Sequence, residues 1–190
     1  MIKPTWLYKP VIIENLQQIQ KECIDIYNKH YSESFGEYGF TFTYIDLEIL
    51  RDEAPSYITY LKELGLYDKW VKSIFVGTKG DRRWDDSQIH VDSEDWETRS
   101  YALNIPVINC EDSYTVWYDV TEYDFQHQDA LYKAARGYDL ATSTEIGRMP
   151  ASKTALINVA VAHRPVTNNP NTRLLISTRF YPEIHDYFKE

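Results

Sequence analysis

The chain has 190 residues, which is enough for one domain with a substantial buried core. Its formal net charge is −9 and Lys and Arg form no cluster, which argues against a nucleic-acid partner, because phosphate binding needs clustered positive charge. The 16 tyrosines and 5 tryptophans favour a β-rich fold, since aromatic rings pack well on a half-buried pleated surface.

The N-terminus and the cysteine content bear on the cellular compartment of the protein. Residues 1–13 interrupt short apolar pieces with two lysines and two prolines, unlike a signal peptide. No stretch approaches the roughly 20 apolar residues that a membrane span needs. The two cysteines, Cys23 and Cys110, are predicted to be free thiols in a reducing compartment. We therefore expect a cytoplasmic protein with no membrane partner.

The first third of the chain has a helical pattern. From Glu14 to about Tyr31, apolar residues recur at three- and four-residue spacings. Residues 42–50 could form a strand or begin a second helix. Pro55 is expected to begin a helix that ends at Gly65, because proline suits the first helical turn and glycine suits a helix end.

The rest of the chain is a series of short β patterns separated by turn residues, which favours a sandwich or barrel. The expected strands are residues 70–76, followed by a turn at Gly77 and Gly80, then 100–108, 114–120, 156–162 and 174–181. The nearly continuous apolar run 156–162 is typical of a strand buried on both faces. The polar segment 122–150 is expected to be partly helical and is long enough for a lid. We expect one domain, with a helical support over 1–68 and a β core over 69–182.

Three candidate metal ligands lie in this β region. His90 and Asp92 are two residues apart, so they share a face if they lie on a strand. His163 follows at the end of the apolar run, where alternation gives it apolar neighbours. A single histidine in such a place is more often a core residue than a ligand. Together, however, two histidines and one carboxylate are the ligand set of the facial triad that holds non-haem Fe(II).

A second His-x-Asp pair shows how unspecific this tripeptide is when taken alone. His127 and Asp129 lie in a polar stretch that leads into no strand. A solvent-exposed loop is the simpler interpretation for that pair. His30 and His185 lie near the ends of the chain and receive no role.

The sequence resembles the 2-oxoglutarate/Fe(II)-dependent dioxygenases over about half of its length, most closely the prolyl and aspartyl/asparaginyl hydroxylase branches. The features that carry the resemblance are, in chain order, His90-x-Asp92, the strand pattern 99–107, the distal His163, and Arg173 ten residues later. The resemblance implies a mainly β (α+β) fold. It would be a double-stranded β-helix, or jelly roll, with the N-terminal helices packed on one sheet.

The resemblance also implies roles for individual residues. His90, Asp92 and His163 would bind Fe(II). Arg173 would bind the distal carboxylate of the cosubstrate 2-oxoglutarate, since a planar guanidinium matches a carboxylate with two hydrogen bonds. Arg179 lies on the same strand face six residues later and is the alternative.

Two residues of the strand 100–108 are further candidates for cosubstrate binding. Asn104 could donate to the cosubstrate or to a metal-bound water, and Pro106 just after it indicates an edge or a bulge. Tyr101 is the alternative, because it lies on the opposite face and alternation alone does not decide which face lines the site. Trp84, Trp96 and Trp117 could line a substrate mouth, although packing is the more common role of such residues.

The activity implied is oxidative decarboxylation of 2-oxoglutarate coupled to hydroxylation of a C–H bond in a protein side chain or a small metabolite. Two other classes of protein remain open. One is a cupin-like metalloenzyme that uses the triad without 2-oxoglutarate, in which Arg173 would be dispensable. The other is a non-catalytic jelly-roll binding module, in which the triad would hold no metal.

Overall fold

The computed structural model describes residues 6–35, 40–78, 89–92, 101–120, 136–138 and 140–180. Its helices are α1 (Leu16–Ile26), continued by the π-helical turn η1 (Tyr27–Tyr31), then α2 (Leu47–Glu53) and α3 (Pro55–Glu63), with short 3-10 turns at Tyr67–Lys69 and Leu140–Thr142. None of the helices in these ranges is long and apolar enough to cross a membrane.

The strands form two antiparallel sheets. The six-stranded sheet has the order β1 (Tyr8–Pro10), β9 (Ala155–Asn158), β5 (Tyr101–Ile108), β11 (Arg173–Phe180), β3 (Trp70–Thr78), β2 (Phe40–Ile45). The five-stranded sheet has the order β7 (Arg136–Tyr138), β4 (Ile89–Val91), β10 (His163–Thr167), β6 (Ser113–Val120), β8 (Ser143–Pro150). Apart from β2 and β3, the neighbours in each order are not consecutive strands, and the chain crosses between the sheets repeatedly. This is the expected double-stranded β-helix.

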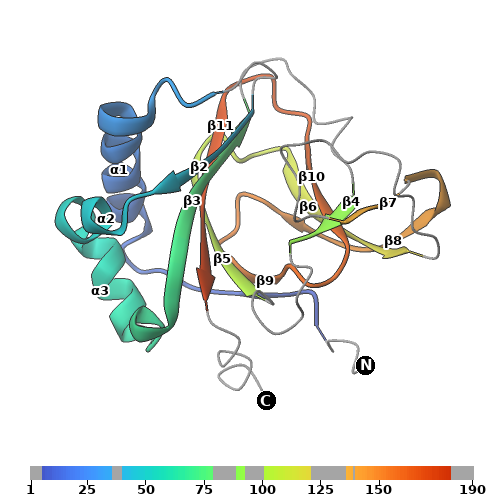
Figure 1. Ribbon diagram of the computed structural model, residues 1–190, viewed down its shortest axis with the longest axis horizontal. Helices are drawn as coiled ribbons and strands as arrows, with labels where there is room; N and C mark the ends of the chain where they lie inside the picture. Colours follow the sequence, from blue (N-terminus) through green and yellow to red (C-terminus); the bar gives the residue numbers. More distant parts are fainter. Residues whose placement is uncertain are drawn as a thin grey trace.

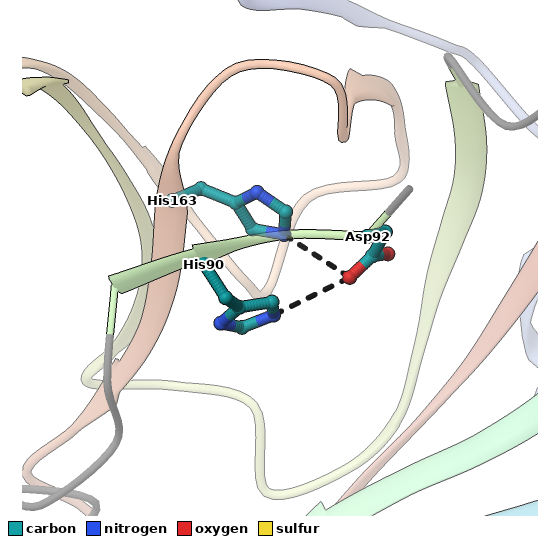
Figure 2. Close-up of side chains that lie close together, drawn as sticks. All are labelled: His90, Asp92 and His163. Carbon is teal, nitrogen blue, oxygen red and sulfur yellow. Dashed lines mark ion pairs between the residues drawn. The ribbon is translucent and has the colours of Figure 1, made fainter. Parts of the chain in front are cut away.

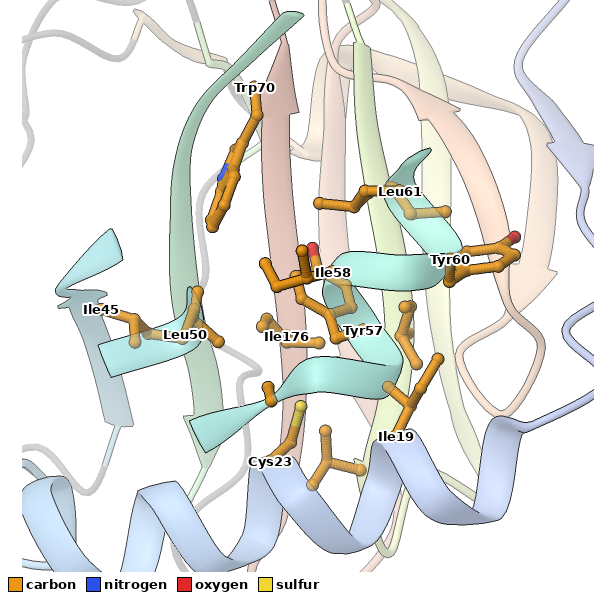
Figure 3. Packing of buried hydrophobic residues seen from close by; sticks show 14 of the residues in the cluster. Ile19, Cys23, Ile45, Leu50, Tyr57, Ile58, Tyr60, Leu61, Trp70 and Ile176 are labelled. Atoms are coloured by element: carbon orange, nitrogen blue, oxygen red, sulfur yellow. The ribbon is translucent and has the colours of Figure 1, made fainter. Parts of the chain in front are cut away.

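The three N-terminal helices cover one face of the six-stranded sheet, and the five-stranded sheet lies on its other side (Figure 1). Figure 3 shows the layer between helices and sheet, where Ile19 and Cys23 of α1 and Tyr57 of α3 pack toward Ile176 of β11. The hydroxyls of Tyr57 and Thr178 are hydrogen-bonded, which fixes α3 on β11. The predicted support of one sheet by N-terminal helices is confirmed.

Alternation along β11 divides its side chains between two environments. Leu174, Ile176 and Phe180 belong to the core beneath the helices. Leu175 instead packs in a separate cluster with Ala151, which follows β8 of the opposite sheet. Since side chains two apart share a face, the odd-numbered residues of β11, including Arg173, face the space between the two sheets.

Several sequence predictions hold at the level of elements. The ambiguous segment 42–50 contains both candidates, because β2 ends at Ile45 and α2 begins at Leu47, with the Asp46 side chain accepting from the Glu48 N–H at its N-cap. Gly65 ends the helical region with a φ of 66°. A register shift opposite Pro106 of β5 confirms the predicted irregularity there.

The interpretation of 156–162 as one strand is wrong. β9 ends at Asn158, the chain turns, and β10 begins in the other sheet at His163. The apolar run is continuous because the turn is buried too: Val159 is fully buried and Ala160 is 8% exposed. His163 therefore begins a strand and does not end one.

The segment 122–150 contains strands that the sequence did not predict, because β7 and β8 complete the five-stranded sheet. It also contains the 3-10 turn Leu140–Thr142. Residues 121–135, which hold nearly all of the predicted helix around 130–136 and much of the predicted lid, lie outside the described residues.

The turn expected at Gly77 needs correction, since β3 continues to Thr78. A Cβ on Gly77 would lie 2.7 Å from the backbone oxygen of Arg173, so glycine serves close packing of two strands there. Gly80 lies outside the described residues.

This close approach gives a test of the sheet packing. The variant Gly77→Ala is expected to lower the free energy of unfolding by about 1–3 kcal/mol, because the added methyl meets backbone that cannot move aside freely. The matched control is Gly147→Ala, whose methyl meets only the side-chain tip of Leu7, at 2.6 Å. Urea unfolding of both variants measures the difference. Equal stability of the two would contradict the close packing of β3 on β11.

Candidate metal centre

The pairing of β4 with β10 brings the two histidines together. His90 and His163 lie directly opposite each other in the antiparallel register, so their side chains share the inner face of the five-stranded sheet. Asp92 is two residues beyond His90, immediately after β4, and its backbone N–H donates to the Val159 carbonyl at 3.1 Å. The register of one strand pair and one backbone hydrogen bond thus position all three side chains.

The three side chains converge on one point, as Figure 2 shows. The Nε2 atom of His90 is 3.3 Å from Oδ1 of Asp92, and that of His163 is 3.9 Å from the same oxygen. One ligand atom from each residue lies within 4.8 Å of the others. Two imidazole nitrogens and one carboxylate oxygen suit Fe(II) and leave coordination positions open.

A hydrogen bond holds His163 in the form that a metal needs. Its Nδ1 lies 2.9 Å from the Val161 carbonyl oxygen, which can only accept, so Nδ1 carries the proton. The lone pair is then on Nε2, the atom that faces Asp92. Such a bond from the second ring nitrogen to a carbonyl is the usual support of a metal-binding histidine.

The ionisation states also suit metal binding. Burial, with a smaller effect of the nearby His90, lowers the pKa of His163 to about 4, so this ring is neutral near pH 7. Burial alone would raise the pKa of Asp92, but the guanidinium of Arg179 and the hydrogen bond from His90 hold it well below its usual range. The site therefore presents an ionised carboxylate at Asp92 and a neutral imidazole at His163, which are the ligating forms of these two residues.

The two candidate arginines differ in their surroundings. Arg173 is 1% exposed, and its Nε and Nη1 atoms have no hydrogen-bond partner. Thr78, directly opposite on β3, is also buried and its hydroxyl has no partner either. Arg179 instead pairs with Asp92 and donates from Nη1 to the Ser177 hydroxyl at 3.0 Å. Donors remain for an anion beside Arg173, whereas Arg179 is already engaged by a carboxylate of the triad.

The two candidates on β5 lie on opposite faces of the sheet. Asn104 is opposite Ser177 of β11 and accepts a hydrogen bond from the Ser177 hydroxyl at 2.6 Å, so it faces the space between the sheets. Tyr101 belongs to the core beneath the helices, where it stacks on Trp6 with ring centroids 4.9 Å apart. The position of Tyr101 does not support cosubstrate binding, and we do not propose it further.

The remaining histidines and tryptophans considered from the sequence either have other hydrogen-bond partners or lie outside the described residues. Trp117 is fully buried and donates to the Asn158 carbonyl, so it packs in the core and does not line a mouth. His30 pairs with Glu53 at the surface beside the helices. The second His-x-Asp pair, His185, Trp84 and Trp96 lie outside the described residues.

Sequence reasoning missed the contact between Arg179 and Asp92 and the pairing of Thr78 with Arg173. Both depend on strand register: residues 92 and 179 are 87 positions apart, and 78 and 173 meet only because β3 and β11 are neighbours. For the pairing of Thr78 with Arg173, the available signal was a polar threonine at the end of an apolar strand. No sequence signal indicated the contact between Arg179 and Asp92.

Comparison with known proteins gives structural matches alone. No protein-family model and no curated protein matches the sequence. Among solved structures, HygX from Streptomyces hygroscopicus, with nickel and 2-oxoglutarate bound, is similar with a TM-score of 0.52 and 10% identity over 93% of this chain and 82% of that one. A prolyl hydroxylase from Trichoplax adhaerens, in complex with a peptide fragment of hypoxia inducible factor, has a TM-score of 0.50 and 11% identity over 98% and 88%. AviO1 from Streptomyces viridochromogenes has a TM-score of 0.50 and 12% identity over 90% and 86%.

These likenesses extend over nearly the whole chain and establish the fold. The chain has a double-stranded β-helix architecture, which it shares with HygX and the Trichoplax adhaerens prolyl hydroxylase. At 10–12% identity they do not transfer an activity, so function has to be argued from the side chains of the site.

The burial of His163 predicts a dependence of stability on pH in the metal-free protein. The folded chain holds this pKa at about 4 against an ordinary 6.5, so the unfolded chain binds more protons between those values. The free energy of unfolding should fall as the pH drops from about 6.5 to about 4, by up to about 1.4 kcal/mol per pH unit. Urea unfolding across this range measures the slope, and His163→Gln should reduce it. An identical slope in the variant would contradict the neutral, buried state of His163.

Proposed function

We propose that this protein is an Fe(II)- and 2-oxoglutarate-dependent oxygenase that hydroxylates a C–H bond of its substrate. The observation that carries the proposal is the convergence of His90, Asp92 and His163 on the inner face of the five-stranded sheet. These three would hold the metal. Arg173 would hold the distal carboxylate of 2-oxoglutarate.

The chemistry of the donor set supports iron. Two neutral imidazoles and one hard carboxylate are the facial triad of non-haem Fe(II) oxygenases, whereas structural zinc sites usually have four protein ligands. Only three candidate ligands converge among the described residues. A centre with three protein ligands keeps positions for a cosubstrate and for O2.

The unpartnered donors of Arg173 support an anionic cosubstrate. Burying a guanidinium without a carboxylate counterion is costly, and the partner of Arg173 among the described residues is the weakly interacting Cys110 thiol. A carboxylate between Arg173 and Thr78 would accept from the guanidinium and from the hydroxyl. It would satisfy the three buried polar atoms of this strand pair together.

The tasks of the protein in this proposal are binding and orientation. Bound iron and the keto acid supply the oxidising chemistry. The two histidines and Asp92 fix the metal, and Arg173 with Thr78 fixes one end of the cosubstrate. Asn104 has its carbonyl oxygen engaged by Ser177, and its amide is directed between the sheets as a further donor to the cosubstrate or to water. The substrate in this proposal is a protein side chain or a small metabolite.

An anaerobic titration tests the function directly. Adding 2-oxoglutarate to the Fe(II)-loaded protein should produce a saturable metal-to-ligand charge-transfer band in the visible range, because keto acid and metal share one site. His163→Ala should bind no Fe(II) and give no band. Binding of iron without the band would favour the metalloenzyme that does not use 2-oxoglutarate. Absence of iron binding would leave a non-catalytic module.

Arg173→Met separates cosubstrate binding from metal binding. The variant should bind Fe(II) like the parent but 2-oxoglutarate about 30-fold more weakly or worse, because an ion pair of about 2 kcal/mol or more is lost. Without ligand it should unfold no more easily than the parent, since the change removes an uncompensated buried charge. The matched control is Arg148→Met, an exposed arginine paired with Glu145. Unchanged affinity for 2-oxoglutarate in Arg173→Met would remove Arg173 from the site.

A further inference from the structure

The two carboxylate oxygens of Asp92 have different partners. Oδ1 faces the Nε2 atoms of both histidines, at 3.3 Å and 3.9 Å. Oδ2 accepts a hydrogen bond from Nη2 of Arg179. Oδ1 thus points to the place where a metal would bind, and Oδ2 is hydrogen-bonded to the guanidinium of Arg179.

Arg179 is itself held in place by a chain of hydrogen bonds on the inner face of the six-stranded sheet. Its Nη1 donates to the Ser177 hydroxyl at 3.0 Å, and that hydroxyl donates to Oδ1 of Asn104 at 2.6 Å. All three residues are at most 9% exposed. The guanidinium therefore reaches Asp92 from a fixed origin on β11 and β5, which is a stronger constraint than an exposed ion pair would impose.

This arrangement bears on how a carboxylate binds a metal. A carboxylate can use one oxygen or both, and it rotates easily between these modes when neither oxygen is otherwise engaged. A planar guanidinium, with its donors in a fixed fork, can hold one oxygen while a second donor is anchored elsewhere. In this protein the fork joins Oδ2 of Asp92 to Ser177.

We infer that Arg179 is a positioning residue that restricts Asp92 to one metal-bound oxygen and so keeps a third coordination position open. The inference rests on the proposed function, because that reaction needs two positions for the keto acid and one for O2. With both oxygens bound, an octahedral metal would keep only two free positions. Arg179 acts through Asp92, while Arg173 at the other end of the strand binds the cosubstrate.

The number of waters on a bound Mn(II) ion tests this without turnover. Mn(II) is octahedral, stable in air and paramagnetic, and the water-proton relaxation that it causes scales with the number of waters it holds. The parent should hold about three waters, and Arg179→Met about two, so the inner-sphere relaxation should fall by roughly a third. Arg179→Lys keeps a cation that can hold Oδ2 and should restore the parent value. Arg148→Met is the control for loss of an arginine elsewhere and should not change it.

The outcomes separate this inference from the proposed function. Loss of relaxation in Arg179→Met with recovery in Arg179→Lys supports the positioning role, which a purely structural arginine would not produce. Equal hydration in the parent and Arg179→Met overturns the inference and leaves the metal site intact. A parent that binds no Mn(II) and no Fe(II) overturns both. If Arg179→Met does not fold, Arg179→Leu takes its place, with the same expected loss, because leucine also offers Oδ2 no donor.

Discussion

The antiparallel pairing of β4 with β10 is the constraint on which the candidate site depends. It places His90 opposite His163 on the inner face of the five-stranded sheet. A shift of the register by one residue would turn one imidazole to the outer face, where Val91 and Val116 pack. Because β4 is only three residues long, the few backbone hydrogen bonds of this strand fix its position in the sheet only weakly. Its place is reinforced by the bond from the Asp92 N–H to Val159, just before β10.

The six-stranded sheet carries both candidate arginines on β11, and one of them, Arg179, contacts Asp92 of the triad. The even-numbered side chains of β11 fill the core beneath the helices, and its odd-numbered ones face inward. Hydrogen bonds of the Thr178 hydroxyl with the hydroxyls of Tyr57 and Ser73 hold the strand on the face that the helices cover, and the bond with Ser73 is 2.8 Å long. The helical layer thus has a consequence for the site, since it fixes the strand from which Arg173 and Arg179 project.

Residue spacing was sufficient to predict that two of the three candidate ligands lie side by side, because their relation is local. His90 and Asp92 are two apart, and a strand needs nothing else to direct them to one side. The sequence placed His163 with the other two candidates, but the strand pattern behind that placement was incomplete. The apolar pattern before it suggested one long strand, whereas the chain leaves one sheet at Asn158 and enters the other at His163. Hydrophobicity records burial, and a buried turn has the same signature as a buried strand.

The contrast between the two arginines shows what sequence could not supply. They stand on the same face of one strand, and spacing from His163 was the only ground for choosing between them. The structure distinguishes them by their partners: Arg179 is neutralised by Asp92, while Arg173 is fully buried with Nε and Nη1 unpaired. A guanidinium buried in this way raises the free energy of the ligand-free protein, and an anion that binds there recovers that cost. Arg173, with two buried donors left without a partner, is therefore the better candidate for binding a carboxylate. Arg179 already pairs with Asp92, where its charge keeps the carboxylate of this candidate metal ligand ionised.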